Sequence, residues 1–263
     1  MGARGDGLAW TLAAWERGLH ESPVDRAVTL LTAVTGISRE EAESADVGSR
    51  DSVLSATLTR MADGVVRSCV RCAGCGERLD VPLDPAALPR TAWRTPGETL
   101  HVEVAGTRVA FRLPDSRDLR MLGMLGGNDA AAGRMLLLSR CLGVEHIEDI
   151  DGTAGVAGIG AVTQTEGITE EVAAAVEAAM EDAAPSGAPT VRIGCPACPA
   201  TTVAALDVSA LLWAEVSASA LALLRDVHAL ARAYGWTEPE VLALSPARRA
   251  AYLEMAYPEM AYG

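Results

Sequence analysis

The residues with the clearest chemical potential are two Cys-x-x-Cys pairs that lie far apart in the sequence. Cys72 and Cys75 belong to the stretch RCAGCGERLDV, and Cys195 and Cys198 belong to GCPACPATTVAALDV. Each pair is followed by residues suited to a strand and then by Leu-Asp-Val. Two thiolates from each of two hairpin tips can complete a tetrahedral zinc site with four sulfur ligands and no open position. The pattern therefore predicts one structural zinc ion, held by the two halves of a zinc ribbon.

The residues beside the two pairs suit tight metal-binding turns. Gly76 follows the first pair and can adopt the left-handed conformation that such a turn requires. Pro196, inside the second pair, preorganises the other turn. Cys69 also has Cys-x-x-Cys spacing with Cys72, but no glycine follows Cys72 directly. We therefore expect the first pair to be Cys72 and Cys75.

The remaining cysteines and the start of the chain bear on the chemistry of this site. Cys69 and Cys141 are predicted to be small core residues. The first residues lack the basic and apolar regions of a secretory signal, so we expect a cytoplasmic protein with reduced thiols. Metal binding is then favoured over disulfides. A metal-free packing cluster and a thioredoxin-like redox pair are the alternatives for the four cysteines.

Composition excludes several classes of function. The sequence has 263 residues, 49% of them hydrophobic, so it can bury a substantial core. The formal net charge is −13, which argues against a nucleic-acid partner. All basic residues are Arg, so no lysine nucleophile or P-loop lysine is present. Residues 203–224 have the length of a membrane span, but Asp207 and Glu215 interrupt them, and an acid at the bilayer centre costs roughly 3 kcal/mol. We therefore predict no membrane insertion.

Catalytic motifs are missing as well. The sequence has no Gly-x-Ser-x-Gly, His-Glu-x-x-His or Walker motif, and its four histidines are scattered. Residues 143–167 fit neither a dinucleotide-binding loop nor a calcium loop and are predicted to form a surface loop. The acids within it are interpreted as a solvated stretch; they are Glu145, Glu148, Asp149 and Asp151. We therefore expect no enzymatic activity.

Hydrophobic periodicity predicts an α+β fold with helical N-terminal and C-terminal parts around small antiparallel hairpins. Three regions are expected: a helical region at 1–64, an α+β region at 65–207 that carries both cysteine knuckles and a Gly-rich insert near 150–167, and a long helix with a small helical docking module at 208–263. Residues 98–114 form the clearest predicted hairpin, with its turn at Ala105-Gly106.

The C-terminal segment has the residues of a docking module. Ser245 is placed to cap a helix in which Arg248 and Arg249 are expected to be exposed beside Tyr252. Trp236 follows a helix-ending glycine. Trp, Tyr and Arg dominate binding hot spots, so these four residues are candidates for partner contact. The alternative is a structural lid with Trp236 as a packed anchor.

The sequence resembles the T-even-phage baseplate hub assembly chaperone family, including its relatives in phage-tail-like contractile injection systems. The resemblance covers most of the chain. It is carried by the two cysteine stretches, by TRVAFRLP and above all by LLRDVHALARAYGWTEPEVLALSPARRAAYLEM; the insert at 150–167 departs from the family pattern. It implies a cytoplasmic, non-enzymatic assembly chaperone or structural component whose partners are baseplate, hub or spike proteins.

Residue by residue, the resemblance extends to the four knuckle cysteines and to Trp236, Arg248, Arg249 and Tyr252 of the tail. A zinc-stabilised thiol-redox or enzyme accessory protein is the alternative from another class. It requires an exposed cysteine with a low pKa.

Overall fold

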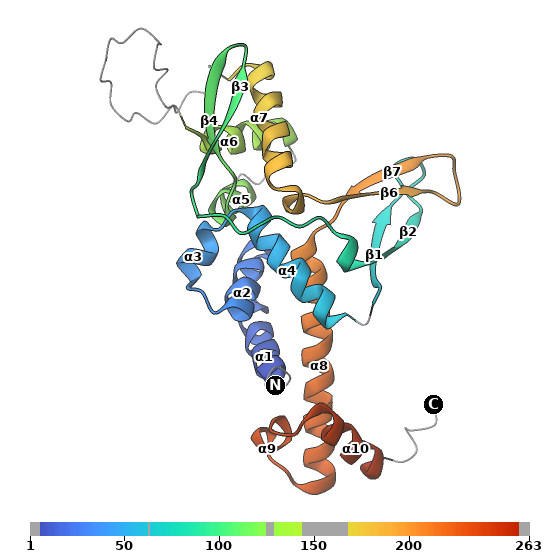
Figure 1. The fold of residues 1–263 in the computed structure, drawn as a ribbon. Helices are drawn as coiled ribbons and strands as arrows, with labels where there is room; N and C mark the ends of the chain where they lie inside the picture. Colours follow the sequence, from blue (N-terminus) through green and yellow to red (C-terminus); the bar gives the residue numbers. More distant parts are fainter. Residues whose placement is uncertain (1–5, 63, 125–128, 144–167, 258–263) are drawn as a thin grey trace. The chain divides into compact units, whose positions relative to one another are not determined.

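The computed structural model describes residues 6–62, 64–124, 129–143 and 168–257 (Figure 1). Within these ranges the chain combines helices with three small antiparallel sheets, which confirms the predicted mixture of helices and hairpins. The predictions for residues 144–167, including the Gly-rich insert and its acids, lie outside the described residues.

The helices are α1 Asp6–Gly18, α2 Pro23–Thr35, α3 Arg39–Ser44, α4 Val47–Met61, α5 Ser116–Met124, α6 Ala130–Cys141, α7 Glu170–Ala183, α8 Val208–Tyr234, α9 Glu238–Leu242 and α10 Pro246–Ala256, with short 3₁₀ turns η1 Pro85–Ala87 and η3 Pro185–Gly187. The strands are β1 Val66–Arg71, β2 Arg78–Leu83, β3 Thr99–Val104, β4 Thr107–Arg112, β5 Leu142–Gly143, β6 Thr190–Gly194 and β7 Thr201–Ala205. The chain divides into two compact units: one runs from Ile37 to Val208, and the other joins the residues up to Gly36 to those from Ser209 onward.

Helix starts in the first of these units follow local capping signals. Ser38 and Glu41 form a capping box, in which the Ser38 backbone N–H donates to the Glu41 carboxylate at 2.9 Å. Helix α4 begins at Val47, because Asp46 Oδ1 accepts from the backbone N–H of Ser49 at 2.8 Å.

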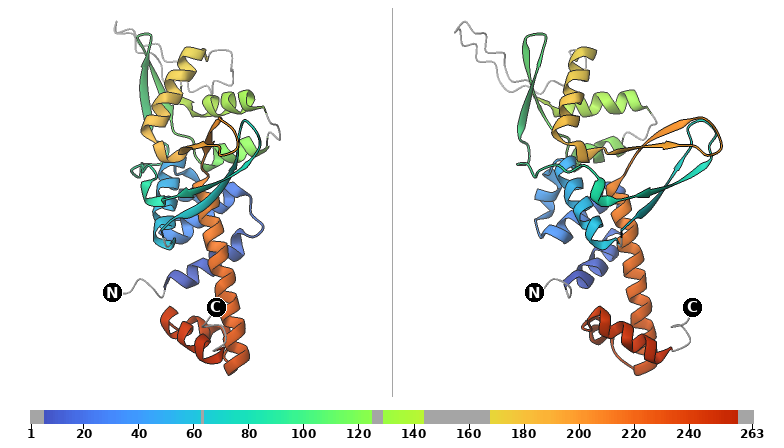
Figure 2. Two further views of the ribbon diagram at one scale, coloured as in Figure 1. Left: turned by 90° about the vertical axis from the view of Figure 1, so that its right-hand side faces the viewer. Right: turned by 45° about the vertical axis from the view of Figure 1, so that its right-hand side comes forward.

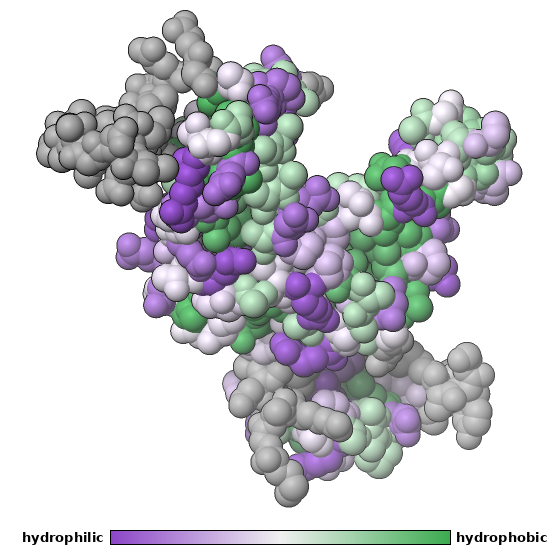
Figure 3. Space-filling model, turned by 45° about the horizontal axis from the view of Figure 1, so that its top comes forward, coloured by the Kyte–Doolittle hydropathy of each residue, from purple (hydrophilic) through white to green (hydrophobic). Residues whose placement is uncertain are grey.

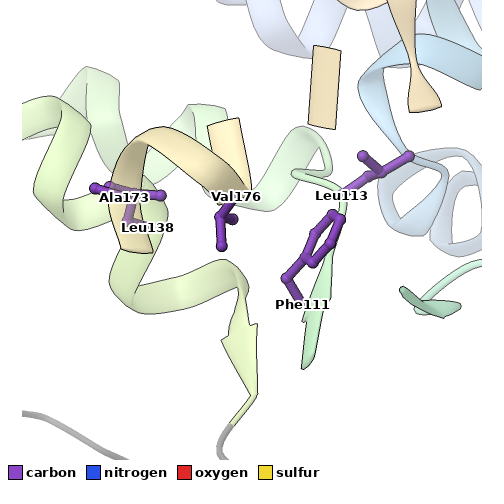
Figure 4. Packing of buried hydrophobic residues seen from close by; sticks show 5 residues of the cluster. All are labelled: Phe111, Leu113, Leu138, Ala173 and Val176. Atoms are coloured by element: carbon purple, nitrogen blue, oxygen red, sulfur yellow. The ribbon is translucent and has the colours of Figure 1, made fainter. Parts of the chain in front are cut away.

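The β3–β4 hairpin covers a buried apolar cluster of the same unit. Its turn residues Ala105 and Gly106 have φ values of 50° and 78°, which fits the twist of a two-residue hairpin turn. Burial alternates along β3, whereas Ala110 and Phe111 of β4 are both buried, and the hairpin packs on α6 and α7 (Figure 4). The buried cluster comprises Phe111, Leu113, Leu138, Ala173 and Val176.

A buried carboxylate ties β4 to α5 and α6. Asp118 is 0% exposed and accepts two hydrogen bonds from the guanidinium of Arg112, at 2.6 and 2.9 Å, and one from Arg140 Nε at 2.6 Å. Burial by itself raises the pKa of Asp118, but the hydrogen bonds from Arg112, Asp115 and Arg140 lower it to about 2. The paired charges therefore stabilise the folded unit at every pH at which Asp118 is ionised.

Helix α4 connects the bases of the β1–β2 hairpin and the β6–β7 hairpin. Ser52 Oγ accepts from the backbone N–H of Thr91 at 3.1 Å, and Ser186 Oγ donates to the carbonyl of Gly48 at 2.7 Å. A Cβ added to Gly48 would lie 2.5 Å from the Cβ of Ala184, so only glycine fits there. Because α4 contacts η1 after β2 and η3 before β6, this helix fixes where both hairpins leave the body of the unit.

The second unit is built on α8, which ends at Tyr234; the helix-ending glycine expected before Trp236 is Gly235, in the left-handed conformation with φ 72°. Leu12 of α1 packs with Ala220 and Leu223, and the Arg26 guanidinium lies 4.9 Å from the ring centroid of Trp213. By length and hydropathy α8 also passes as a membrane span, a test that the core helix of a soluble protein passes equally. The absence of membrane insertion stays a prediction.

The Asp118 cluster generates a prediction about stability. Asp118→Asn should lower the free energy of unfolding by about 3–5 kcal/mol, because it leaves two guanidinium groups around a neutral side chain. Since the folded pKa of Asp118 lies below that of an ordinary aspartate, its contribution is present above about pH 4 and is lost as the pH falls toward 2. Urea unfolding followed by circular dichroism at several pH values measures both effects.

Glu170→Gln is the matched control, because it breaks an exposed ion pair with Arg134. Such a pair contributes about 0–1 kcal/mol. If both variants lowered the free energy of unfolding equally, the buried cluster would contribute no more to stability than an exposed ion pair.

Candidate metal centre

Two antiparallel hairpins present the four predicted cysteines at their tips. In the first, β1 pairs with β2 from Val66↔Leu83 to Arg71↔Arg78, and residues 72–77 form the turn. In the second, β6 pairs with β7 from Thr190↔Ala205 to Gly194↔Thr201, and residues 195–200 form the turn. The views in Figures 1 and 2 show the two hairpins side by side. We call the two turns the first and the second knuckle.

The two knuckles share one hydrogen-bond pattern. The backbone N–H of the first cysteine donates to a carbonyl five residues on: Cys72 to Glu77 at 2.8 Å and Cys195 to Ala200 at 3.0 Å. The N–H two residues after that cysteine faces its sulfur, at 3.4 Å in both knuckles. Gly76 has a φ of 75°, as its place after the first pair predicts. The repeated Cys-x-x-Cys motif thus corresponds to a repeated local structure.

All four sulfur atoms meet in one cluster. The Sγ atoms of Cys72, Cys75, Cys195 and Cys198 lie within 4.8 Å of one another. Cys72 and Cys198 are 3.6 Å apart, as are Cys75 and Cys195. A tetrahedral ion with metal–sulfur bonds of about 2.3 Å has sulfur–sulfur edges of about 3.8 Å. The residues present therefore fit a four-coordinate metal ion, whereas a disulfide requires about 2.05 Å.

The first knuckle contacts the second hairpin directly. The backbone N–H of Ala73 donates to Oγ1 of Thr202, in β7, at 3.0 Å. A Cβ added to Gly74 would lie 2.8 Å from the Cβ of Ala200, so the small residue allows the two backbones to approach. These contacts bring the sulfur atoms together without any sulfur–sulfur bond.

Proton affinities within the cluster are uneven. The N–H groups of Cys75 and Gly74 lower the pKa of Cys72 to about 6. The Glu77 N–H acts to lower the pKa of Cys75, but the sulfurs of the second knuckle outweigh it and raise that pKa to about 12. Cys72 is buried and Cys75 is exposed, so low pKa and exposure fall on different residues. A cation bound among the four sulfurs would displace the protons that otherwise hold them together.

One expectation about this region is wrong. Cys69 is exposed, not a core residue, because burial alternates along β1 and Cys69 falls on its exposed positions; Cys141 is buried as expected. The two Leu-Asp-Val triplets lie in different elements, since the first is within β2 and the second leads from β7 into α8. Their likeness in sequence does not extend to structure.

The predicted tail residues lie in the other unit. Trp236 stacks on Tyr234 with ring centroids 4.8 Å apart and meets Tyr252 edge to face at 4.8 Å. Arg248 is exposed as predicted, but Arg249 is buried and donates to Asp226 Oδ2 at 2.9 Å. The expectation that both arginines are exposed is therefore wrong for Arg249.

Sequence reasoning missed Tyr234 and Asp226, the partners of these tail residues on α8. Both residues could have been proposed as partners of the tail from the sequence, because both belong to the long helix that immediately precedes the tail. Among the described residues, the four-cysteine cluster is the one group of three or more potential ligands that lies within metal-binding distance. No family model, no curated protein and no solved structure matches the chain.

The cluster geometry predicts one metal ion per chain. Cobalt(II) titration of the reduced protein should saturate at one equivalent and give the visible absorption of a tetrahedral thiolate site. Cys72→Ser and Cys198→Ser should remove that absorption and lower the melting temperature, because metal binding contributes to folding free energy. Cys69→Ser is the matched control and should bind normally. Loss of binding with Cys69→Ser but not with Cys75→Ser would identify the other Cys-x-x-Cys pair as the ligand set.

Metal affinity should depend on pH in one direction. Since the metal-free cluster holds at least one proton at neutral pH, on Cys75, binding must displace it. The association constant should fall by about tenfold or more for each unit of acidification between pH 8 and 6. Competition with a chelator of known affinity at each pH measures this slope, and an affinity independent of pH would contradict the assignment.

Proposed function

We propose that the four cysteines bind a structural zinc ion and that the protein is a non-enzymatic assembly factor or structural component of the baseplate or hub of a contractile, phage-tail-like injection system. The observation that carries the metal part is the closed cluster of four sulfur atoms shared by two hairpins distant in sequence. Its two parts, the metal and the assembly role, rest on different evidence.

The donor set favours zinc. Tetrahedral sites of four soft thiolates in proteins hold zinc or iron–sulfur centres. Zinc has no redox chemistry of its own, and its four-thiolate sites are structural because no position is open to substrate. A redox enzyme would instead need one cysteine that is both exposed and low in pKa. Here these properties fall on Cys75 and Cys72 respectively.

The assembly role rests on the sequence resemblance and is supported by the surface of the tail. Tyr234 is 40% exposed beside Trp236 and Tyr252, and Met255 on α10 is 63% exposed. Arg248 projects from the first turn of the same helix. Aromatic and arginine side chains of this kind dominate protein–protein contacts. The tail therefore presents a surface suited to a baseplate, hub or spike protein.

Apolar surface also accompanies the hairpins. Val65, just before β1, is 61% exposed, and Val203 on β7 is 55% exposed. Figure 3 shows apolar surface, in green, on the side where the hairpins project. Apolar surface of this kind can serve as an interaction site where it is contiguous. The metal ion would keep this surface in a defined shape.

The proposal predicts different outcomes for the two tail arginines. Arg248→Ala should keep the melting temperature and lower recovery of baseplate proteins in a pull-down by about tenfold, as expected when a hot-spot residue is truncated. Arg249→Ala should lower the melting temperature, because it removes the buried partner of Asp226. The pull-down uses the tagged full chain expressed in a strain that produces the other baseplate proteins but lacks the sheath.

Arg17→Ala is the matched control, because Arg17 is an exposed arginine of the same unit outside the tail. Undiminished recovery with both Arg248→Ala and Trp236→Ala would reduce the tail to a structural lid.

A further inference from the structure

The sulfur pairs in contact within the metal centre join different hairpins. Cys75 meets Cys195, and Cys72 meets Cys198, each at 3.6 Å. Every other pair of these sulfurs is also within 4.8 Å. Both of these 3.6 Å contacts thus join a sulfur of one knuckle to a sulfur of the other.

The two contacts differ in access from solvent. Cys72 is buried and Cys198 is partly exposed, so the Cys72–Cys198 contact is part-buried and forms the inner side of the cluster. Cys75 is exposed and Cys195 is partly exposed, so their contact forms the outer side. An oxidant in solution reaches the outer pair first.

We propose that a hydroperoxide oxidises this centre to a disulfide between Cys75 and Cys195, which expels the metal ion and leaves the two hairpins covalently joined. The proposal rests on the metal-binding part of the proposed function and is independent of the assembly role. It makes the centre a reversible cross-link: a metal ion joins the hairpins under reducing conditions, and a disulfide joins them under oxidising conditions.

The chemistry requires one two-electron oxidant. A thiolate of the outer pair attacks one oxygen of the peroxide O–O bond, which breaks to give a sulfenic acid on that cysteine and releases hydroxide or alkoxide. The other cysteine of the pair then attacks that sulfur and gives up its proton if it carries one, the S–O bond breaks, and hydroxide or water leaves. The two cysteines lose two electrons in total and one peroxide is reduced. With two of its four ligands lost, the metal ion dissociates.

Local structure opposes the competing disulfide inside the first knuckle. Cys72 and Cys75 are held in a turn in which the Gly76 N–H donates to the Cys72 carbonyl at 2.9 Å. The Gly74 N–H also faces Cys72 Sγ at 3.4 Å. Joining Cys72 to Cys75 would draw the buried Cys72 sulfur away from this N–H group, whereas joining Cys75 to Cys195 needs two accessible sulfur atoms to approach by about 1.5 Å.

The test starts from reduced, zinc-loaded protein whose metal content is measured first. One molar equivalent of hydrogen peroxide is added, released zinc is followed with a chromogenic chelator, and the monomer is digested with trypsin without reduction. Cleavage at Arg71 and Arg78 gives CAGCGER, and cleavage at Arg192 and Arg225 gives a second peptide with both other cysteines. We expect these two peptides to be linked, with one zinc released per disulfide. Dithiothreitol and added zinc should restore the starting state.

Variants locate the bond. Peroxide treatment of metal-free variants should yield no linked peptide from Cys75→Ser or Cys195→Ser and a linked peptide from Cys72→Ser and Cys198→Ser. Cys69→Ser is the control and should behave as the unaltered chain. An internal disulfide within CAGCGER, or a bond to Cys69, would overturn the proposal. A protein without zinc at the start would refute the metal assignment instead, while the metal-free variants would still test the disulfide.

Discussion

The four-sulfur contact at the tips of two hairpins is the constraint on which this structure depends. Thiolates within 4.8 Å of one another repel unless protons or a cation lie between them. A two-stranded hairpin is marginally stable by itself, and each of these sheets has two strands. A metal ion bound at the tips would therefore contribute where the fold is weakest.

Such a contact is possible only if the hairpin bases are correctly placed. Helix α4 supplies that placement through buried hydroxyl groups: Ser52 holds the segment after β2, and Ser186 holds the segment before β6. The close approach of Gly48 to Ala184 fixes the same junction. Farther from the site, the Asp118 cluster fixes the β3–β4 hairpin to α5 and α6. The hairpins are thus anchored at their bases by hydrogen bonds and joined at their tips by sulfur.

Local features were predictable from sequence, and features that depend on packing were not. The two Cys-x-x-Cys turns, the capping box at Ser38 and the turn at Ala105-Gly106 follow from spacing and backbone preference over a few residues. Exposure of Cys69 and burial of Arg249 depend on which face of a strand or helix meets its neighbour. The hydroxyl contacts of α4 join residues far apart in sequence and have no local signal. The partner proteins and the assembly role remain proposals.

X-ray absorption spectroscopy at the zinc edge, on protein purified under reducing conditions without added metal, tests the central claim most directly. The account predicts one zinc ion per chain with four sulfur ligands at about 2.3 Å and no nitrogen or oxygen ligand. A sample without zinc, or a zinc ion with fewer than four sulfur ligands, would contradict it.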